Sequence, residues 1–187
     1  DTVLSHFSYT FEKGFIYGIT APSGTGKTTL LNLIGNILKP AQGEIETDFK
    51  TGIAYVFQEP ELLSQLTIAE NIALPLTAYL KKEIAFEQAI SILQKMELDG
   101  FENRFPNELS FGQQQRAAIA RALTYPSPLL LMDEPFKGLD EALSRRIIKR
   151  IRERQTENGQ TILFTSHNPG ELRLFADKTV RLDPTSH

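Results

Sequence analysis

Residues 21–28, Ala-Pro-Ser-Gly-Thr-Gly-Lys-Thr, decide how the rest of this chain is interpreted. They follow the apolar run Phe15–Thr20, so the pattern predicts a loop that leads from a buried strand into a helix. Glycines let backbone N–H groups surround an anion, a lysine supplies a charge for the β- and γ-phosphates, and a threonine hydroxyl can bind Mg²⁺. The segment therefore predicts a nucleotide-binding loop, and a glycine-rich turn without a ligand is the alternative. Its candidate residues are Ser23, Gly24, Thr25, Gly26, Lys27, Thr28 and Thr29.

The composition indicates one soluble globular domain, since 187 residues with 41% hydrophobic and 23% charged side chains can bury a proper core. A net charge of −3 gives no general attraction to nucleic acid or anionic lipid. The absence of cysteine excludes disulfides and thiolate metal sites, which fits a reducing compartment. No apolar run approaches the ~20 residues that span a bilayer, and no signal segment opens the sequence. We therefore expect any membrane association to come through a partner.

Short apolar runs alternate with helical patterns along the chain. Because strands and helices alternate, we expect an α/β fold with a mainly parallel central sheet flanked by helices. Residues from about 59 to 116 carry no convincing strand pattern and predict an inserted helical lobe. The expected strands are 15–20, 52–57, 129–133 and 161–165, and the expected helices are 27–35, 82–96, one capped by Thr67 and Glu70, one from Ser110 to about Thr124, and one ending near Gly159.

Polar side chains stand where three of these strands end. Asp133 and Glu134 close the run 129–133, where Asp133 can orient Mg²⁺ and Glu134 can polarise a water that attacks the γ-phosphate. Gln58 follows a second strand, and its amide can bind Mg²⁺ or hold that water. His167 follows the last apolar strand and can contact the γ-phosphate. Each residue alone also fits ordinary polar surface, but together with a phosphate loop they favour a catalytic site.

The segment Leu109–Arg116 opens a helix with features of an anion site. Ser110 is a natural N-cap, Gly112 allows close approach, and Gln113 stands in the first turn. A plain capped helix is the alternative reading of this segment alone.

In this order the segments resemble the ATP-binding cassette (ABC) ATPases, which are P-loop NTPases, and the resemblance covers nearly the whole chain. In that family the phosphate loop is followed by a Q-loop glutamine, here Gln58, and by a signature, here Leu109–Gln113. The acidic strand end, a D-loop at Gly138-Leu139-Asp140 and a switch histidine at His167 come after it. The signature is the specific feature, because other phosphate-loop ATPases and kinases lack it.

The resemblance implies a head-to-tail pair of cassettes that holds two ATP molecules between the phosphate loop of one copy and the signature of the other. Ser110, Gly112 and Gln113 would then contact the γ-phosphate bound by the second copy, and Asp140 would lie at the interface between the copies. Closure of the pair requires ATP, and hydrolysis reopens it.

The resemblance also implies roles within each copy, with ATP and Mg²⁺ as cofactors. Glu134 is the expected general base, His167 the sensor of the γ-phosphate, and Gln58 the third catalytic residue. Thr28, Gln58 and Asp133 are the expected ligands of Mg²⁺. The nucleotide-binding core would comprise residues 1–58 and 117–187, and the helical subdomain with the signature about 59–116.

Three positions depart from the family pattern. Ala21 replaces the first glycine of the phosphate loop, which is compatible with a negative φ at that residue. Phe111 replaces the first glycine of the signature and puts a bulky ring near the composite site. The stretch Thr2–Phe11 resembles the second strand of the family fold, which implies that the first strand and the aromatic residue that stacks on adenine are missing. Tyr9 and Tyr17 are the available substitutes, and their positions in expected strands argue against both.

A cassette of this size resembles the separate ATPase subunit of a bacterial transporter, a peripheral protein on the cytoplasmic face of the membrane. The implied partners are a second copy or a paralogous ATPase subunit, a membrane-spanning subunit and a solute-binding protein, with no nucleic acid. The segment Glu59–Thr67 would receive the coupling helix of the membrane subunit. The sequences of Leu66–Leu76 and Asp133–Phe136 resemble those of the nitrate/sulfonate/taurine-type importers.

Two other functions stay open at this point. A non-transport ABC ATPase acting on DNA, ribosomes or cell-division machinery would usually carry coiled-coil insertions or tandem cassettes, and neither is visible. The basic run between Arg145 and Arg154 is more typical of a solvated helix face than of a nucleic-acid site. A non-hydrolysing regulatory module would fit the unusual signature, but Lys27, Asp133, Glu134 and His167 argue against it.

Overall fold

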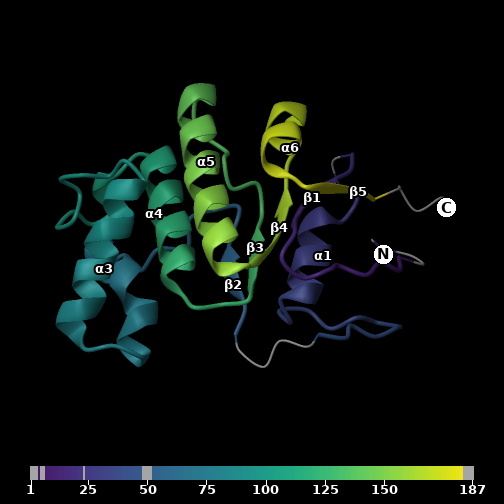
Figure 1. The fold of residues 1–187 in the computed structure, drawn as a ribbon, viewed down its shortest axis with the longest axis horizontal. Helices are drawn as coiled ribbons and strands as arrows, with labels where there is room; N and C mark the ends of the chain where they lie inside the picture. The colour runs from purple at the N-terminus through teal and green to yellow at the C-terminus, as the bar shows by residue number, and fades with distance from the viewer. Residues whose placement is uncertain (1–3, 5–6, 23, 48–51, 183–187) are drawn as a thin grey trace. The chain divides into compact units, whose positions relative to one another are not determined.

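A parallel sheet organises the part of the chain that the computed structural model describes, which is Leu4 and residues 7–22, 24–47 and 52–182. Its strand order is β2-β3-β4-β1-β5 (Figure 1). β1 pairs in parallel with both β4 and β5, and β3 pairs in parallel with β4. The predicted mainly parallel sheet is therefore confirmed. The strands are β1 (Ile16–Thr20), β2 (Ala54–Val56), β3 (Leu129–Met132), β4 (Thr161–Thr165) and β5 (Lys178–Arg181).

Helices connect the strands. α1 follows the phosphate loop and the long helix α5 follows β3, both as predicted, and α6 joins β4 to β5. Between residues 59 and 116 the regular elements are all helical, as the missing strand pattern predicts. The helices are α1 (Lys27–Ile34), α2 (Ile68–Ala73), α3 (Lys82–Lys95), α4 (Phe111–Thr124), α5 (Glu141–Asn158) and α6 (Pro169–Phe175), with 3₁₀ turns η1 (Leu74–Ala78) and η2 (Pro106–Glu108).

The chain forms two compact units. The first comprises Asp1–Tyr55, Ser127–Glu134 and Ile151–His187, and the second comprises Val56–Pro126 and Pro135–Arg150. The predicted division into a nucleotide-binding core, 1–58 with 117–187, and a helical subdomain, about 59–116, stays a prediction.

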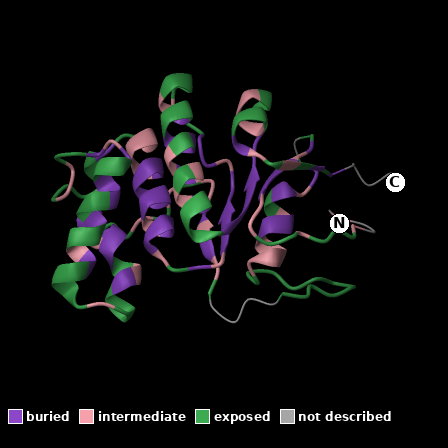
Figure 2. Cartoon of the chain, viewed as in Figure 1, coloured by how far each residue is buried: buried purple, intermediate pink, exposed green. Residues whose placement is uncertain are grey.

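The sheet of the first unit is covered on both faces, because successive side chains of a strand point to opposite sides. On one face, Tyr17 and Ile19 of β1 pack in one buried cluster with Leu30 and Leu31 of α1. On the other face, the ring of Phe164 on β4 lies 4.7 Å from the ring of Phe175 on α6. β3 and β4 are buried along their whole length (Figure 2). Helices on both faces are what a parallel sheet requires.

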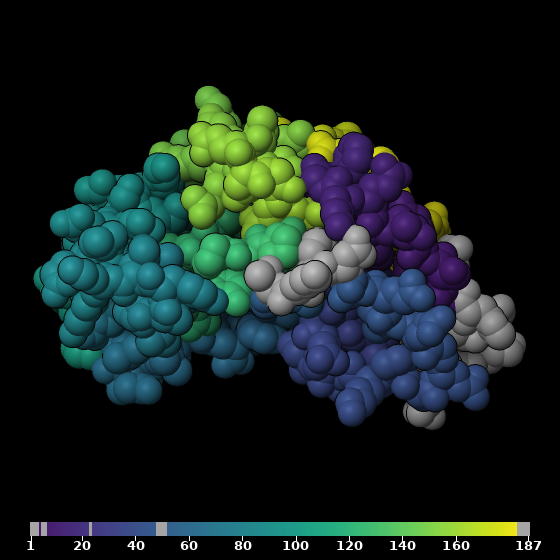
Figure 3. Space-filling model, turned by 60° about the horizontal axis from the view of Figure 1, so that its bottom comes forward, coloured from purple at the N-terminus to yellow at the C-terminus, as the bar shows by residue number. Residues whose placement is uncertain are grey.

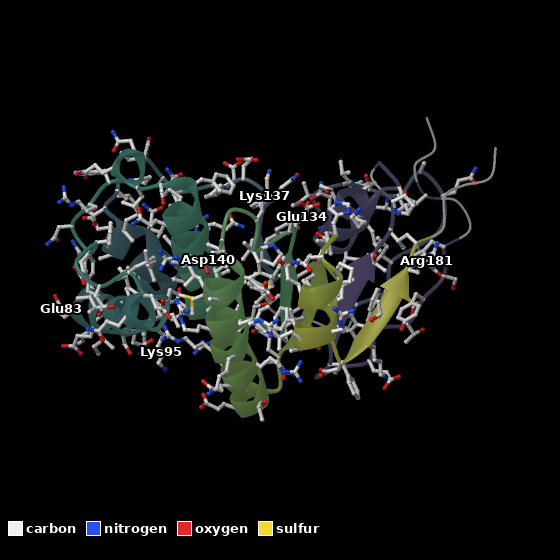
Figure 4. All side chains as sticks on the ribbon, turned by 90° about the horizontal axis from the view of Figure 1, so that it is seen from above. Glu83, Lys95, Glu134, Lys137, Asp140 and Arg181 are labelled. Atoms are coloured by element: carbon white, nitrogen blue, oxygen red, sulfur yellow. The ribbon has the colours of Figure 1, made fainter. Side chains whose placement is uncertain are left out.

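The second unit is built from helices α2, α3 and α4, which pack against one another. α2 begins with the predicted capping box, in which the Thr67 side chain accepts from the Glu70 N–H and the Glu70 carboxylate accepts from the Thr67 N–H. α3 buries Ala85, Ala89 and Leu93 on its inner side, while Glu83 and Lys95 stay exposed (Figure 4). The helix therefore buries Ala85, Ala89, Ile92 and Leu93, whereas Ile90, which its apolar pattern places on the buried side, is exposed.

Three features differ from expectation. α6 and β5 were not predicted, because α6 is short and β5 is an edge strand with one fully buried residue, Val180. Residues 7–11 form no strand, so the expected strand over Thr2–Phe11 is wrong there; residues 1–3 and 5–6 lie outside the described part. The rings of Tyr9 and Phe11 instead pack on Tyr17, at 6.1 and 5.0 Å between centroids, and Phe7 stacks on Tyr9. Side-chain packing therefore holds this segment in place, and none of the described strands pairs with it.

The residues after α1 form an irregular exposed run up to residue 47, drawn in blue in Figure 3. It includes Pro40–Gly43, a Pro- and Gly-containing segment typical of a turn, with Gly43 at φ +82°. Among the described residues, no helix is both long and apolar enough to cross a bilayer.

Gly18 sits where α6 packs on β1, and we expect Gly18→Val to destabilise the protein. An added Cβ would lie 2.7 Å from Leu172 Cδ2 and 3.0 Å from the Ala176 Cβ, so the Leu172 side chain and the segment that carries Ala176 must give way. Overpacking of this kind costs about 1–3 kcal/mol in the free energy of unfolding. Urea denaturation measures the loss, with Thr179→Val on the exposed side of β5 as the control. Equal stability of the two variants would contradict the packing described.

Candidate functional site

The carboxyl ends of β1, β3 and β4 meet at one edge of the sheet, because these strands are parallel and β4 lies between the other two. The register pairs Ile19 with Thr165 and Met132 with Phe164, so Asp133 follows β3 at the level of Thr165. Ligands of open parallel sheets bind at this edge. The predicted phosphate loop, acidic strand end and histidine therefore converge within the first unit.

The phosphate loop has the backbone that an anion site needs. Gly24 and Gly26 adopt φ of +78° and +94°, a conformation that side chains with a Cβ rarely adopt. Ala21 is not among the residues with positive φ, so its methyl group is tolerated there. The buried Lys27 ammonium donates to the carbonyl of Ala21 at 3.0 Å. Thr25 donates its hydroxyl to the Pro22 carbonyl at 2.8 Å, and Ser23 lies outside the described residues.

Asp133 is the most buried acidic group of this edge, with 3% of its surface exposed. Thr28 Oγ1 donates to Asp133 Oδ2 at 2.7 Å, and Thr165 Oγ1 donates to Asp133 Oδ1 at 2.5 Å. Both carboxylate oxygens are thus held by hydroxyl groups from other segments.

Tyr55 lies nearby and donates its hydroxyl to Asn32 Oδ1. Burial raises the pKa of Tyr55, and the charge of Asp133 adds a smaller effect in the same direction. Thr29, the last candidate of the loop, is partly exposed on α1.

Glu134 and His167 are in contact. His167 Nε2 lies 2.7 Å from Glu134 Oε1, and both side chains reach solvent. Glu134 adopts φ +46°, which non-glycine residues seldom adopt, so the backbone turns sharply after Asp133. Its N–H donates to Thr165 Oγ1 at 2.9 Å. The ends of β3 and β4 therefore fix both the backbone and the carboxylate of the predicted general base (Figure 4 labels Glu134).

Sequence reasoning missed two groups at this edge. Thr165 bonds both Asp133 and Glu134, and the only signal for it is a hydroxyl at the end of an apolar strand beside the predicted histidine. Glu171 accepts from Ser166 Oγ at 2.5 Å, and nothing in the sequence marks it. Burial raises the pKa of Glu171; hydrogen bonds from Ser166 and Asn168 oppose this effect, and the Glu134 charge adds to it.

In the second unit, the start of α4 has the predicted N-cap. Ser110 Oγ accepts from the Gln113 N–H, and Gln113 Oε1 accepts from the Ser110 N–H at 2.9 Å, which completes a capping box. The Gln113 side chain is thereby held at the helix start. Asp140 caps α5 in the same way, since its Oδ1 accepts from the Leu143 N–H at 2.8 Å. The carboxylate of Asp140 is exposed.

The signature helix start and the D-loop are in contact within this unit. A Cβ on Gly112 would lie 2.8 Å from the Gly138 carbonyl oxygen, so glycine is required for this approach. The ring of Phe111 covers Gly138, and Lys137 Nζ lies 5.7 Å from the centroid of that ring. The bulky residue of the signature therefore packs against its own D-loop.

Gln58 lies two residues beyond β2 and is partly buried in the second unit. Next to it, Glu59 pairs with Lys137 at 3.1 Å. The segment that follows is fixed by the fully buried Asn71, which accepts from the Leu63 N–H and donates to three carbonyls of the same segment. Arg121 also donates to the Glu61 carbonyl at 2.5 Å. The backbone of this segment is therefore well ordered by side chains of α2 and α4.

The donor set of Thr28 and Asp133 fits Mg²⁺. Hydroxyl and carboxylate oxygens are the hard ligands that this ion prefers, and Mg²⁺ commonly takes only one or two protein ligands beside water and phosphate oxygens. Their oxygens lie 2.7 Å apart at the mouth of the phosphate loop. Gln58, the third predicted ligand, belongs to the second unit.

A glycine-rich loop between β1 and α1, with a buried aspartate and a glutamate–histidine pair at the same sheet edge, defines a nucleotide-binding protein of the phosphate-loop class. Its particular family follows from comparison with known proteins. The model of the ABC transporter family matches residues 4–137. The chain therefore belongs to the ABC transporter family.

Similar proteins agree with this assignment. The thiamine import ATP-binding protein ThiQ of Shigella flexneri serotype 5b (strain 8401) is 38% identical over 184 residues, which cover 93% of this chain and 79% of the relative. ThiQ of Escherichia coli O157:H7 has the same identity and coverage. Dimeric MJ0796 in a post-hydrolysis state with ADP and Pi has a TM-score of 0.89 at 34% identity, covering 97% of this chain and 86% of that one. The chain is an ATP-binding and ATP-hydrolysing cassette that energises the transport of a solute.

Because Phe111 and Gly138 are in contact, we expect the effect of a Gly138 substitution on stability to depend on the residue at position 111. Gly138→Ala should destabilise, because Gly138 has φ +79° and its added Cβ would lie 2.7 Å from Phe111 Cδ1. We expect about 1 kcal/mol from the backbone strain and about 1–3 kcal/mol from the steric contact. Only the second part should disappear in a Phe111→Ala background. Urea denaturation of the four proteins of this cycle measures it, and a cost that is equal in both backgrounds would rule out the ring contact.

Proposed function

We propose that the sheet edge of the first unit hydrolyses ATP with Glu134 as general base and His167 as the group that orients it and senses the γ-phosphate. The contact of 2.7 Å between His167 Nε2 and Glu134 Oε1, at the level of the buried Asp133, is the observation that carries this proposal. The positive φ of Glu134 supports it, since strained backbone often accompanies catalytic residues.

Each residue then has a defined part in the reaction. The N–H groups of residues 23–29 and the Lys27 ammonium bind the phosphates. Thr28 and Asp133 would hold Mg²⁺, which would supply positive charge against the phosphates when bound. Gln58 stays a predicted third ligand. Glu134 accepts a proton from the water that attacks the γ-phosphorus, and ADP leaves. The imidazole of His167 keeps the carboxylate aimed at this water.

We propose that two copies, or this chain and a paralogous ATPase subunit, associate head to tail around the nucleotides. Ser110, Gly112 and Gln113 of one copy would contact the γ-phosphate bound by the other, and Asp140 would lie at their interface. The exposure of Ser110 and Asp140 is compatible with this role. MJ0796, whose fold is similar, is described as a dimer.

The transporter would be an importer with the cassette on the cytoplasmic face of the membrane. Its membrane-spanning subunit would contact the ordered segment 59–67 that follows Gln58, and a solute-binding protein would deliver the solute. The names of the similar proteins favour thiamine over nitrate, sulfonates or taurine as that solute.

A role on nucleic acid has less support. The basic run of α5 was the feature that suggested nucleic-acid binding. Three of its arginines form ion pairs with acidic side chains of their own unit. Arg146 and Arg150 pair with Glu97, and Arg152 pairs with Asp177. Such pairing fits a solvated helix face.

Replacement of Glu134 tests the catalytic proposal. We expect Glu134→Gln to lower turnover by about 10²–10⁴-fold, because the amide cannot accept the proton. ATP affinity should be retained, and the variant should accumulate as a dimer with ATP in size-exclusion chromatography. Glu141→Gln, at an exposed acid of α5, is the matched control. Near-normal turnover of the Glu134 variant would refute the assignment of the base.

The solute is tested with the cassette in its natural transporter. The chain would be co-purified with its membrane subunit and reconstituted in vesicles with the solute-binding protein. We expect thiamine to stimulate ATP hydrolysis and to accumulate in the vesicles, while taurine and nitrate do neither. Stimulation by taurine or nitrate instead would support the other importer group, and co-purification with DNA or ribosomes would support the non-transport function.

A further inference from the structure

The turn between β4 and α6 is held by one network of hydrogen bonds around Ser166. Its hydroxyl donates to Glu171 Oε2 at 2.5 Å and accepts from the Asn168 N–H at 3.0 Å. Asn168 caps α6, since its Oδ1 accepts from the Gly170 N–H at 2.8 Å. Asn168 Nδ2 also lies 3.4 Å from Glu171 Oε1. Glu171 therefore reaches both residues that flank His167.

The side chain of His167 takes no part in this network of described residues. Its side chain is 45% exposed, and its Nε2 contacts Glu134 Oε1. By contrast, Ser166 is 2% exposed, so its hydroxyl needs the partners that it has. The backbone of the turn therefore carries the imidazole to Glu134, and among the described residues Glu171 is the only acidic side chain that bonds Ser166 or Asn168.

We propose that Glu171 is a positioning residue for ATP hydrolysis, which keeps the turn in the conformation that brings His167 to Glu134. Glu171 does not touch the reacting atoms and acts through Ser166 and Asn168. This inference rests on the proposed role of His167. A merely structural role for Glu171, as an acidic residue in the first turn of α6, would stabilise the helix without affecting His167 in particular.

Turnover in single and double variants separates these two roles. We expect Glu171→Leu to lower kcat about tenfold, the effect of about 1.4 kcal/mol on the barrier, while the KM for ATP stays within about twofold. Glu171→Gln keeps an acceptor for Ser166 and should recover most of the loss. In a His167→Ala background, Glu171→Leu should lower kcat by less than about twofold, because its route of action is gone.

Controls keep the test independent of folding. Arg173→Leu, on the exposed side of the same helix, should leave kcat unchanged. Ser166→Ala removes the hydrogen bond between Ser166 and Glu171 from the Ser166 side. Its effect on kcat should depend on His167 in the same way, so this variant replaces Glu171→Leu if Glu171→Leu does not fold. Thermal unfolding and ATP binding are measured for every variant.

The outcomes are distinguishable. A loss of kcat that is as large in the His167→Ala background as in the wild type overturns the inference, and so does a Glu171→Gln variant as impaired as Glu171→Leu. If His167→Ala alone leaves kcat unchanged, the proposed role of His167 falls and this inference falls with it. If His167→Ala is impaired but Glu171→Leu is not, only the role of Glu171 is refuted.

Discussion

Two hydroxyl groups hold the carboxylate of Asp133, one from the helix after the phosphate loop and one from the end of β4. A carboxylate that is 3% exposed is costly to bury unless its oxygens are hydrogen-bonded. Thr28 and Thr165 supply these bonds at 2.7 and 2.5 Å, and both belong to segments distant from Asp133 in the sequence. The burial of one acid therefore fixes the relative positions of three segments that the chemistry needs. This dependence links the stability of the first unit to the geometry of the sheet edge where we propose that ATP is hydrolysed.

The same hydroxyl of Thr165 also accepts from the backbone of Glu134. A residue at φ +46° is less favourable than one in an ordinary conformation, by about 1–3 kcal/mol. The hydrogen bond to Thr165 comes from the end of β4 and the contact with His167 comes from the turn after it, so these contacts compensate the strain after β3. The turn is thus an outcome of tertiary contacts, and the local sequence Asp-Glu-Pro gives no sign of it.

Much of the fold follows from sequence because its signals are local. The apolar runs of β3 and β4 and the capping boxes at Thr67 and Ser110 depend on residues within a few positions of one another. The edge strand β5 escapes this reasoning because its pattern exposes polar residues. At the site, the family pattern leads to Asp133, Glu134 and His167, whereas Thr165 and Glu171 act through contacts that only the folded chain creates.

Phe111 shows how a departure from a motif is resolved by packing. Its ring lies on Gly138, and Lys137 lies over the ring while pairing with Glu59. That ion pair is exposed and contributes little to stability, about 0–1 kcal/mol. The ring contact is the stronger constraint, because a glycine with positive φ leaves room for the aromatic face and no other residue would. A substitution in the signature is thus accommodated by the D-loop of the same unit, so the two motifs must be interpreted as one packed pair.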